Sequence, residues 1–111
     1  MTIYKILPQQ LWSESVDTGS FTGSPIDIAD GFIHFSTAAQ LHETARQHFS
    51  GVPDLVLVAV RASDLGNALR WERSRDGDLF PHLYGSLLVN LAIWVKPLPL
   101  DSHFRPIVPE L

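Results

Sequence analysis

Apolar and polar positions form short blocks at the start of this chain, and these blocks predict one strand followed by one helix. The apolar run Ile3 to Leu7 is typical of a short strand, which Pro8 ends. The next ten residues, Gln9 to Thr18, predict a helix, and Gly19 supplies its left-handed exit. The apolar residues of this helix are expected close to one buried face: Leu11, Trp12 and Val16.

The middle of the chain predicts a loop, a strand and the best-defined helix. Gly19 to Asp30 is rich in turn-forming residues, with one helical turn expected at Ser24 and Pro25. Asp30-Gly31 then predicts a turn, and Phe32 to Phe35 a short strand. Thr37 and Gln40 have the spacing of a capping box, which predicts a helix starting there. Its apolar side repeats at helical spacing before Gly51 and Pro53 end it: Leu41, Ala45 and Phe49.

The continuous apolar run Leu55 to Val60 predicts a central strand that is buried on both faces. A brief turn at Ser63 to Leu65 follows. Apolar and charged residues then alternate over Leu69 to Arg73, as in a half-buried strand with Leu69 and Trp71 directed inward.

The last third of the chain predicts a hairpin and a final strand. Asp76-Gly77 is a strong hairpin signal, and Leu79 to His82 forms the returning strand. Pro81 cannot donate a backbone hydrogen bond, so we expect it at a sheet edge or a strand end. Val89 to Val95 predicts the final strand, followed by a proline-spaced tail that lies extended against the body.

Taken in order, these elements predict an α+β domain of two small, mostly antiparallel sheets with one main helix after Thr37. Short strands and hairpin turns cluster after residue 50, whereas a doubly wound protein would alternate long helices with parallel strands.

Length and composition fit one folded domain. The chain has 111 residues, of which 45% are hydrophobic and 10% aromatic, enough to form one core. No segment approaches the roughly 20 apolar residues of a membrane span, and the first residues lack a secretory signal pattern. No cysteine is present, which fits a reducing compartment, so a cytoplasmic location is expected.

The net charge of −4 comes from eight basic residues scattered among twelve acidic ones. The chain therefore has no basic stripe for a nucleic-acid backbone, although a nucleotide-sized ligand needs only one or two local cations. The oligomeric state is left open.

Polar residues that suit a binding site precede the predicted main helix. His34, Ser36 and Thr37 lie at the junction of strand and helix, where unpaired N–H groups favour anions. Ordinary structural roles are the alternatives: His34 as a half-buried strand imidazole, and Thr37 as a helix cap.

A second polar group surrounds the hairpin. Glu72 would share a strand face with Arg70, which would keep its carboxyl group ionised, although a solvated cross-strand ion pair is an alternative interpretation. His82 follows Pro81 at a strand end, and Tyr84 could stack on a flat ring; a loop held by Pro and Gly would also explain these residues.

Metal and serine-hydrolase chemistry are not expected. His42 and His48 lie six residues apart on the predicted helix, on different faces, and no His-x-x-x-His pair occurs. Ser36 is not part of a Gly-x-Ser-x-Gly motif, although a Ser36–His34 pair in space stays open.

Three ordered motifs resemble the domain of unknown function 952 family across nearly the whole chain. They are Asp30 to Thr37 with Gln40, Arg70-Trp71-Glu72, and Gly77 to Gly85. The fold of that family is similar to that of the ADP-ribosyltransferases, which bind NAD in a cleft between two small antiparallel sheets. The resemblance therefore implies an ADP-ribosylation-like fold.

By this resemblance the domain is expected to bind NAD or an ADP-ribose-related nucleotide, with NAD as a substrate if it is an ADP-ribosyltransferase or NAD glycohydrolase. The alternative is a non-catalytic module that binds a small ligand or a protein through the same cleft. Glu72 and His34 are then the expected catalytic residues. The expected ligand-binding residues are Ser36, Thr37, Arg70, His82 and Tyr84. We expect His34, Ser36, Glu72, His82 and Tyr84 to border one cleft.

Overall fold

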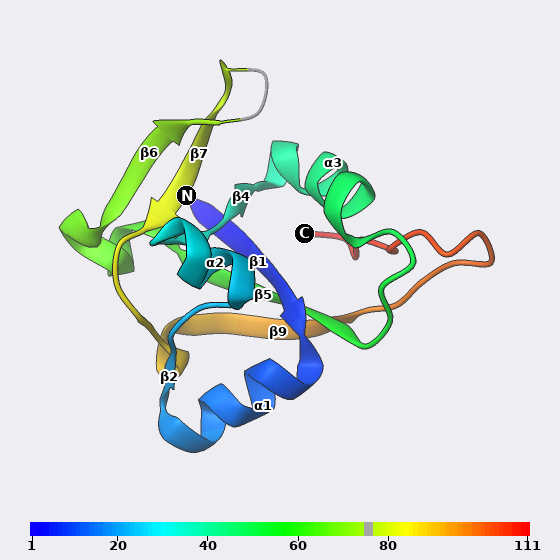
Figure 1. Cartoon of the computed structure of the whole chain (residues 1–111), viewed down its shortest axis with the longest axis horizontal. Coiled ribbons are helices and arrows are strands. Elements are labelled where there is room, and N and C mark those ends of the chain that lie inside the picture. Colours follow the sequence, from blue (N-terminus) through cyan, green and yellow to red (C-terminus); the bar gives the residue numbers. More distant parts are fainter. Residues whose placement is uncertain (75–76) are drawn as a thin grey trace.

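The computed structural model describes residues 1–74 and 77–111, which form small antiparallel sheets with helices packed on the largest one (Figure 1). The predicted α+β class with small antiparallel sheets is confirmed. In chain order the elements are β1 (Thr2–Pro8), α1 (Gln9–Thr18), β2 (Ser20–Phe21), α2 (Pro25–Asp30), β3 (Ile33–His34), β4 (Ser36–Thr37), α3 (Ala38–Phe49), β5 (Leu55–Arg61), the 3₁₀ segment η1 (Ala62–Ala68), β6 (Leu69–Arg73), β7 (Leu79–Leu83), β8 (Leu87–Leu88), the 3₁₀ turn η3 (Val89–Leu91) and β9 (Ala92–Leu98).

The largest sheet has the strand order β4-β1-β5-β9, and its pairs are antiparallel. Strand β5 is central and buried on both faces, as its continuous apolar run predicts. Its side chains alternate between two core clusters, because successive residues of a strand point to opposite faces. Val56, Val58 and Val60 join the cluster that contains Trp12 of α1. Leu55, Leu57 and Ala59 join the cluster that contains Leu41 and Ala45 of α3.

A three-stranded sheet of order β3-β7-β6 stands beside the first one. The prediction that Pro81 marks an edge is wrong, because β7 is the middle strand. Strand β3 pairs with β7 only at Ile33↔Leu83 and His34↔His82, so the ladder has ended where Pro81 lies. The Pro81 carbonyl still accepts a hydrogen bond from the Phe35 amide at 3.0 Å. The missing N–H of proline therefore breaks no pairing.

The predicted strand Phe32 to Phe35 is shorter than expected, and a second strand follows it in another sheet. Strand β3 covers only Ile33–His34 and belongs to the three-stranded sheet, whereas β4, which begins at Ser36, pairs with β1 in the larger sheet. Phe35 lies at the crossing and is buried. This short segment therefore fixes the position of His34 relative to Ser36 across the boundary between the sheets.

The helix ends agree with the capping signals of the sequence. Helix α1 spans the predicted residues and ends at Gly19, whose φ is 90°. Helix α2 begins with a capping box of Ser24 and Asp27, and α3 with one of Thr37 and Gln40. The buried face of α1 was predicted wrongly at Val16, which is exposed. That face runs through Trp12 and Ser15, where the hydroxyl of Ser15 bonds to the Leu11 carbonyl.

Two predictions in the last third of the chain are also corrected. The final strand β9 starts three residues later than expected and includes Pro97, which an edge strand tolerates because no neighbour needs its N–H. Trp71 was expected to face inward but is 41% exposed, and no residue of β6 is fully buried. Arg70 and Glu72 alternate with it, and they are the residues that stand opposite the buried His82 and Phe80 of β7.

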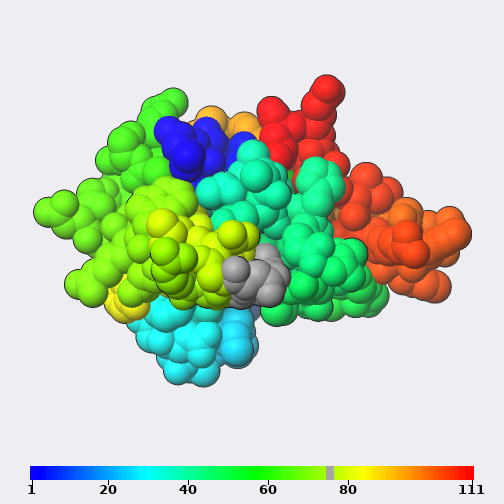
Figure 2. Space-filling view, turned by 90° about the horizontal axis from the view of Figure 1, so that it is seen from above, coloured from blue at the N-terminus to red at the C-terminus, as the bar shows by residue number. Residues whose placement is uncertain are grey.

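The predicted Asp76-Gly77 turn involves Asp76, which lies outside the described residues. Strands β6 and β7 on either side do pair as an antiparallel hairpin. In Figure 2 the yellow part of this hairpin lies against the teal and green surface of α3, where Gln40 donates a hydrogen bond to the Leu79 carbonyl. Within residues 1–74 and 77–111, no helix has the length and apolar character needed to cross a membrane.

Candidate functional site

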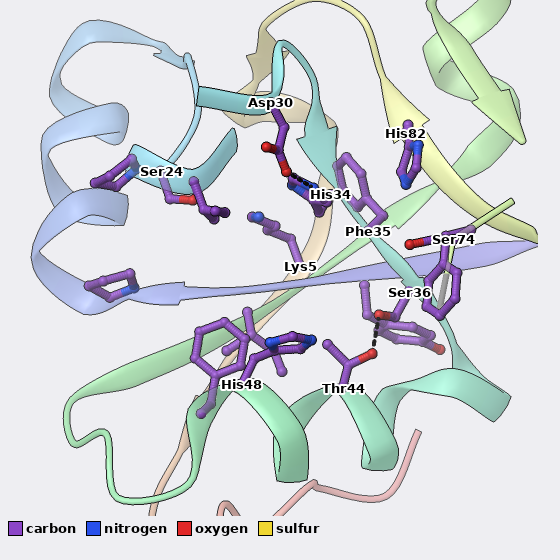
Figure 3. Close-up of a pocket in the computed structure, with 17 residues that line it drawn as sticks. Lys5, Ser24, Asp30, His34, Phe35, Ser36, Thr44, His48, Ser74 and His82 are labelled. Atoms are coloured by element: carbon purple, nitrogen blue, oxygen red, sulfur yellow. Dashed lines mark hydrogen bonds and ion pairs between the residues drawn. The ribbon is translucent and has the colours of Figure 1, made fainter. Parts of the chain in front are cut away.

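A cavity of about 600 Å³ lies where β1, α2, α3 and the β6–β7 hairpin meet. Residues from both main sheets line it, including β1 and β4 of the larger sheet and β3 and β7 of the smaller one. Its aromatic wall comprises Tyr4, Phe35, Phe49 and Phe80. Its polar lining includes Lys5, Ser24, Asp30, His34, Ser36 and His82, most of which are labelled in Figure 3.

Asp27, next to this cavity, is the centre of a buried polar network. Its carboxylate lies 2.9 Å from the Nζ of Lys5 and 2.6 Å from the Nδ1 of His34. It also accepts hydrogen bonds from the backbone amides of Ser24 and His34. These contacts join β1, α2 and β3, so Asp27 holds His34 at a fixed place at the cavity.

The charges in this network shift each other's ionisation. Burial alone would raise the pKa of Asp27, but the hydrogen bond to His34 and the charge of Lys5 outweigh it and hold that pKa well below its ordinary value. Burial lowers the pKa of Lys5, and the Asp27 carboxylate opposes this change. The Asp27 side chain is thus an ionised carboxylate, and the groups around it donate hydrogen bonds to it.

His34 makes a second contact with a carboxylate through its other nitrogen. Its Nε2 lies 3.0 Å from Asp30 of α2, as the dashed line in Figure 3 marks. The Nδ1 contact is a hydrogen bond in which the ionised Asp27 carboxylate accepts from the ring. Asp27 and Asp30 thus lie against the two ring nitrogens of His34 and fix the orientation of its ring.

His82 is held by a different carboxylate. Its Nδ1 lies 2.8 Å from Glu72, and the Tyr84 hydroxyl donates to the same carboxylate oxygen at 2.7 Å. These two hydrogen bonds, first that of His82 and then that of Tyr84, lower the pKa of Glu72. The guanidinium of Arg70 lies over the Tyr84 ring at 4.7 Å. Glu72 is therefore an ionised acceptor that ties the hairpin residues together.

Phe32 is a part of the site that sequence reasoning missed. Its ring stacks on His82 with centroids 4.0 Å apart and lies 4.6 Å from the ring of His34. It also lies 5.3 Å from Tyr84. Its place two residues before His34 put it on the same strand face, and this spacing was the available signal. The Phe32 ring therefore covers one face of the His82 ring.

Ser36 and Thr37 have structural partners. The Ser36 hydroxyl lies 2.9 Å from that of Thr44, which connects β4 with α3 (Figure 3). Thr37 accepts a hydrogen bond from the Gln40 amide as the cap of α3. Ser36 lines the cavity, whereas Thr37 is not among its lining residues.

The other expected site residues fall into two groups, those that line the cavity and those that do not. His34, Ser36 and His82 line the cavity. Arg70, Glu72 and Tyr84 do not line it. Glu72 bonds to the cavity residue His82, Tyr84 donates to Glu72, and Arg70 lies over the Tyr84 ring. The pairs His34↔His82, Arg70↔His82 and Glu72↔Phe80 stand directly opposite in the sheet, so these residues share one face. Of the five residues expected to border one cleft, three line the cavity, whereas Glu72 and Tyr84 do not.

Lys5 and Asp30 were not expected in the site. A lone lysine within the apolar run of β1 was a usable signal, because a charge buried in a strand needs an opposite charge. Its partner Asp27, 22 residues away, was not deducible from spacing. Among the described residues, no three side chains of His, Asp or Glu are grouped so as to hold a metal ion.

The chain matches a protein-family model and solved structures. The model of the family described as "Protein of unknown function (DUF952)" matches residues 6–95. The X-ray structure of protein CC0527 from Caulobacter crescentus is 47% identical, covering 96% of this chain and 94% of that one, with a TM-score of 0.94. The solution NMR structure of CC0527 is 48% identical and covers 95% and 90% of the two chains, with a TM-score of 0.86. No curated protein matches the chain.

Proposed function

Because the chain belongs to the DUF952 family of proteins of unknown function, membership brings no activity with it, and we propose from the site itself that the cavity binds NAD or an ADP-ribose-related nucleotide. The observation that carries the proposal is the position of the cavity, which is lined from both main sheets. This is where a domain with an ADP-ribosylation-like fold, which we also propose here, would hold its nucleotide.

The size and lining of the cavity support a ligand of this class. Its volume of about 600 Å³ falls within the range of small-molecule sites, roughly 300 to 1,000 Å³. Tyr4, Phe49 and Phe80 offer aromatic surface for a flat base. His34, Ser36 and His82 lie on the polar side, where hydroxyl groups of a ribose would be placed.

The charges of the site indicate how such a ligand would be held. Lys5 and His34 are matched by Asp27 and Asp30, so the polar side offers little unbalanced positive charge. Binding would depend on stacking and hydroxyl hydrogen bonds more than on attraction of the pyrophosphate. We therefore expect the affinity for ADP-ribose to change little with salt concentration, in contrast to sites built on unpaired cations.

An ADP-ribosyltransferase or NAD glycohydrolase would need a carboxylate near the nicotinamide ribose. Glu72 is ionised, as required for stabilising a positively charged transition state, and it lies on the sheet face of His34 and His82. Two hydrogen bonds already engage one of its oxygens, and it does not line the cavity. This observation favours the second candidate, a non-catalytic module that binds the same ligand.

Calorimetric titration with NAD, ADP-ribose and nicotinamide tests the binding proposal. We expect NAD and ADP-ribose to bind, and His34→Ala to weaken both, because His34 lies on the polar side of the cavity. His42→Ala is the matched control, because His42 is exposed on α3 and outside the cavity. If none of the three ligands binds at millimolar concentration, the nucleotide proposal is wrong.

A nicotinamide-release assay separates the two candidates. If the domain is an enzyme, the wild-type protein releases nicotinamide from NAD, Glu72→Gln abolishes release, and the control Glu43→Gln on the exposed side of α3 retains it. Binding of NAD without release supports the module.

A further inference from the structure

The His82 ring is held at one nitrogen and on one face. Its Nδ1 is bonded to Glu72, and one ring face is stacked against Phe32. The residue is only 5% exposed and yet lines the cavity (Figure 3). What it offers to the cavity is therefore decided by the state of its second nitrogen, Nε2.

The neighbours of Glu72 fix the proton on Nδ1. Glu72 accepts a hydrogen bond from Tyr84 through the same oxygen that faces Nδ1, and the Arg70 guanidinium lies over the Tyr84 ring. An ionised carboxylate has no proton to donate, so Nδ1 must be the donor. In a neutral imidazole with its proton on Nδ1, Nε2 carries the lone pair.

Nε2 itself is open to the cavity. Within residues 1–74 and 77–111, no hydrogen-bond partner of Nε2 is found, and no buried side-chain nitrogen or oxygen lacks a partner. Nε2 is therefore not sealed in the core. Because His82 lines the cavity, the lone pair faces the space in which a ligand would lie.

His34 is placed differently, although its ring centroid lies only 5.5 Å from that of His82. A carboxylate lies at each of its ring nitrogens, Asp27 at Nδ1 and Asp30 at Nε2. Both ring nitrogens of His34 thus have a protein neighbour, whereas Nε2 of His82 has no hydrogen-bond partner among the described residues.

We infer that Nε2 of His82 is a proton acceptor for a ligand in the cavity, that it takes a hydroxyl or N–H donor of that ligand, and that Glu72 and Tyr84 are positioning residues that act through it. In a nucleotide the matching donor is a ribose hydroxyl. If the proton is transferred, it leaves the hydroxyl oxygen for Nε2, and the imidazolium formed is stabilised by the Glu72 carboxylate. The inference uses the cavity of the proposed function, but not the identity of its ligand.

Long-range ¹H–¹⁵N correlation NMR of the ligand-free protein at about pH 8 tests the state of His82. We expect the Nδ1-protonated tautomer in the wild type and in Glu72→Gln, whose amide oxygen still accepts from Nδ1. Glu72→Ala removes that acceptor and should lose the preference, and the control Glu43→Gln should not change it. A wild-type His82 that is protonated on Nε2, or a tautomer indifferent to Glu72→Ala, overturns the inference.

Acylation with diethyl pyrocarbonate, read by peptide mapping, tests the open lone pair. Only an unprotonated imidazole nitrogen reacts, so His82 should be acylated at Nε2, because its Nδ1 donates to Glu72. Exposed His42 gives the reference rate. A His82 that stays unmodified while His42 reacts, or that is acylated at Nδ1, refutes the assignment.

The same reaction repeated with NAD or ADP-ribose separates the two proposals. Protection of His82 supports both. If the tautomer and the acylation pattern are as expected but neither nucleotide protects His82, the proton acceptor stands and the proposed ligand is wrong.

Discussion

Asp27 is the residue on which the polar side of the site depends. Its carboxylate accepts from a lysine, an imidazole and two backbone amides, and the side chain is almost completely buried. Removal of one partner from a buried ion pair leaves an uncompensated charge, which costs far more than the pair itself contributes.

We expect Asp27→Asn to lower the free energy of unfolding by roughly 3 to 5 kcal/mol, because the buried Lys5 would lose its opposite charge and His34 its carboxylate acceptor. Urea denaturation measures this change. Asp17→Asn on the exposed side of α1 is the matched control and should be nearly neutral. A loss below about 1 kcal/mol for Asp27→Asn would show that the network contributes little.

The lowered pKa of Asp27 also predicts acid sensitivity. The folded-state pKa lies below the ordinary value of 3.8, so the stabilisation is fully present above that value and is lost as the pH falls through and below it. The free energy of unfolding should therefore decrease from about pH 5 to about pH 2 more steeply in the wild type than in Asp27→Asn. Equal slopes in urea titrations across this range would contradict the assignment.

At the scale of elements, the end of α2 positions β3. Gly31 has a φ of 87°, and its amide bonds to the Asp27 carbonyl at 2.8 Å, closing the helix three residues before His34. A left-handed backbone at this point turns the chain from α2 into the strand that carries the imidazole. The short helix therefore determines both where Asp27 lies and where His34 begins.

We expect Gly31→Ala to destabilise the protein by about 1 to 2 kcal/mol, because a Cβ atom strains this backbone conformation although no atom stands in its way. Gly85→Ala is the matched control, since Gly85 also has free space around it but no left-handed φ. Thermal or urea denaturation compares the two. Similar losses in both variants would mean that backbone conformation is not the cause.

Across the whole molecule, the two core clusters share the central sheet. Strands β1 and β5 contribute side chains to both clusters, so neither can lose its packing while the other keeps an intact sheet. Trp12 belongs to one cluster, and Trp94 packs against the other. We therefore expect one cooperative unfolding transition for the domain.

Two variants with a single tryptophan check this cooperativity. One keeps Trp12 and the other keeps Trp94, with phenylalanine at the remaining tryptophan positions. Within each variant the denaturation midpoint from fluorescence should coincide with that from circular dichroism. A fluorescence midpoint that departs from the circular dichroism midpoint in either variant would show that one cluster unfolds separately.

The local chemistry of the sequence determined the helices and the central strand. Capping residues such as Thr37 and Ser24 satisfy the free amides at the start of α3 and α2, and these are contacts with near neighbours in the chain. The apolar run of β5 could be buried only in the middle of a sheet. His34, Ser36 and His82 were also found from sequence, because polar residues beside turns stood out from the surrounding apolar strands.

Only the tertiary structure decided which strands pair and which charges meet. The segment from Ile33 to Thr37 contributes to two sheets, and Pro81 occupies a middle strand, because short ladders leave individual backbone groups without a pairing requirement. Asp27 meets Lys5 across 22 residues, and Glu72 meets His82 across ten. Such contacts follow from register and sheet order, which no local spacing encodes, and they determine that carboxylates lie at both ring nitrogens of His34 but at only one ring nitrogen of His82.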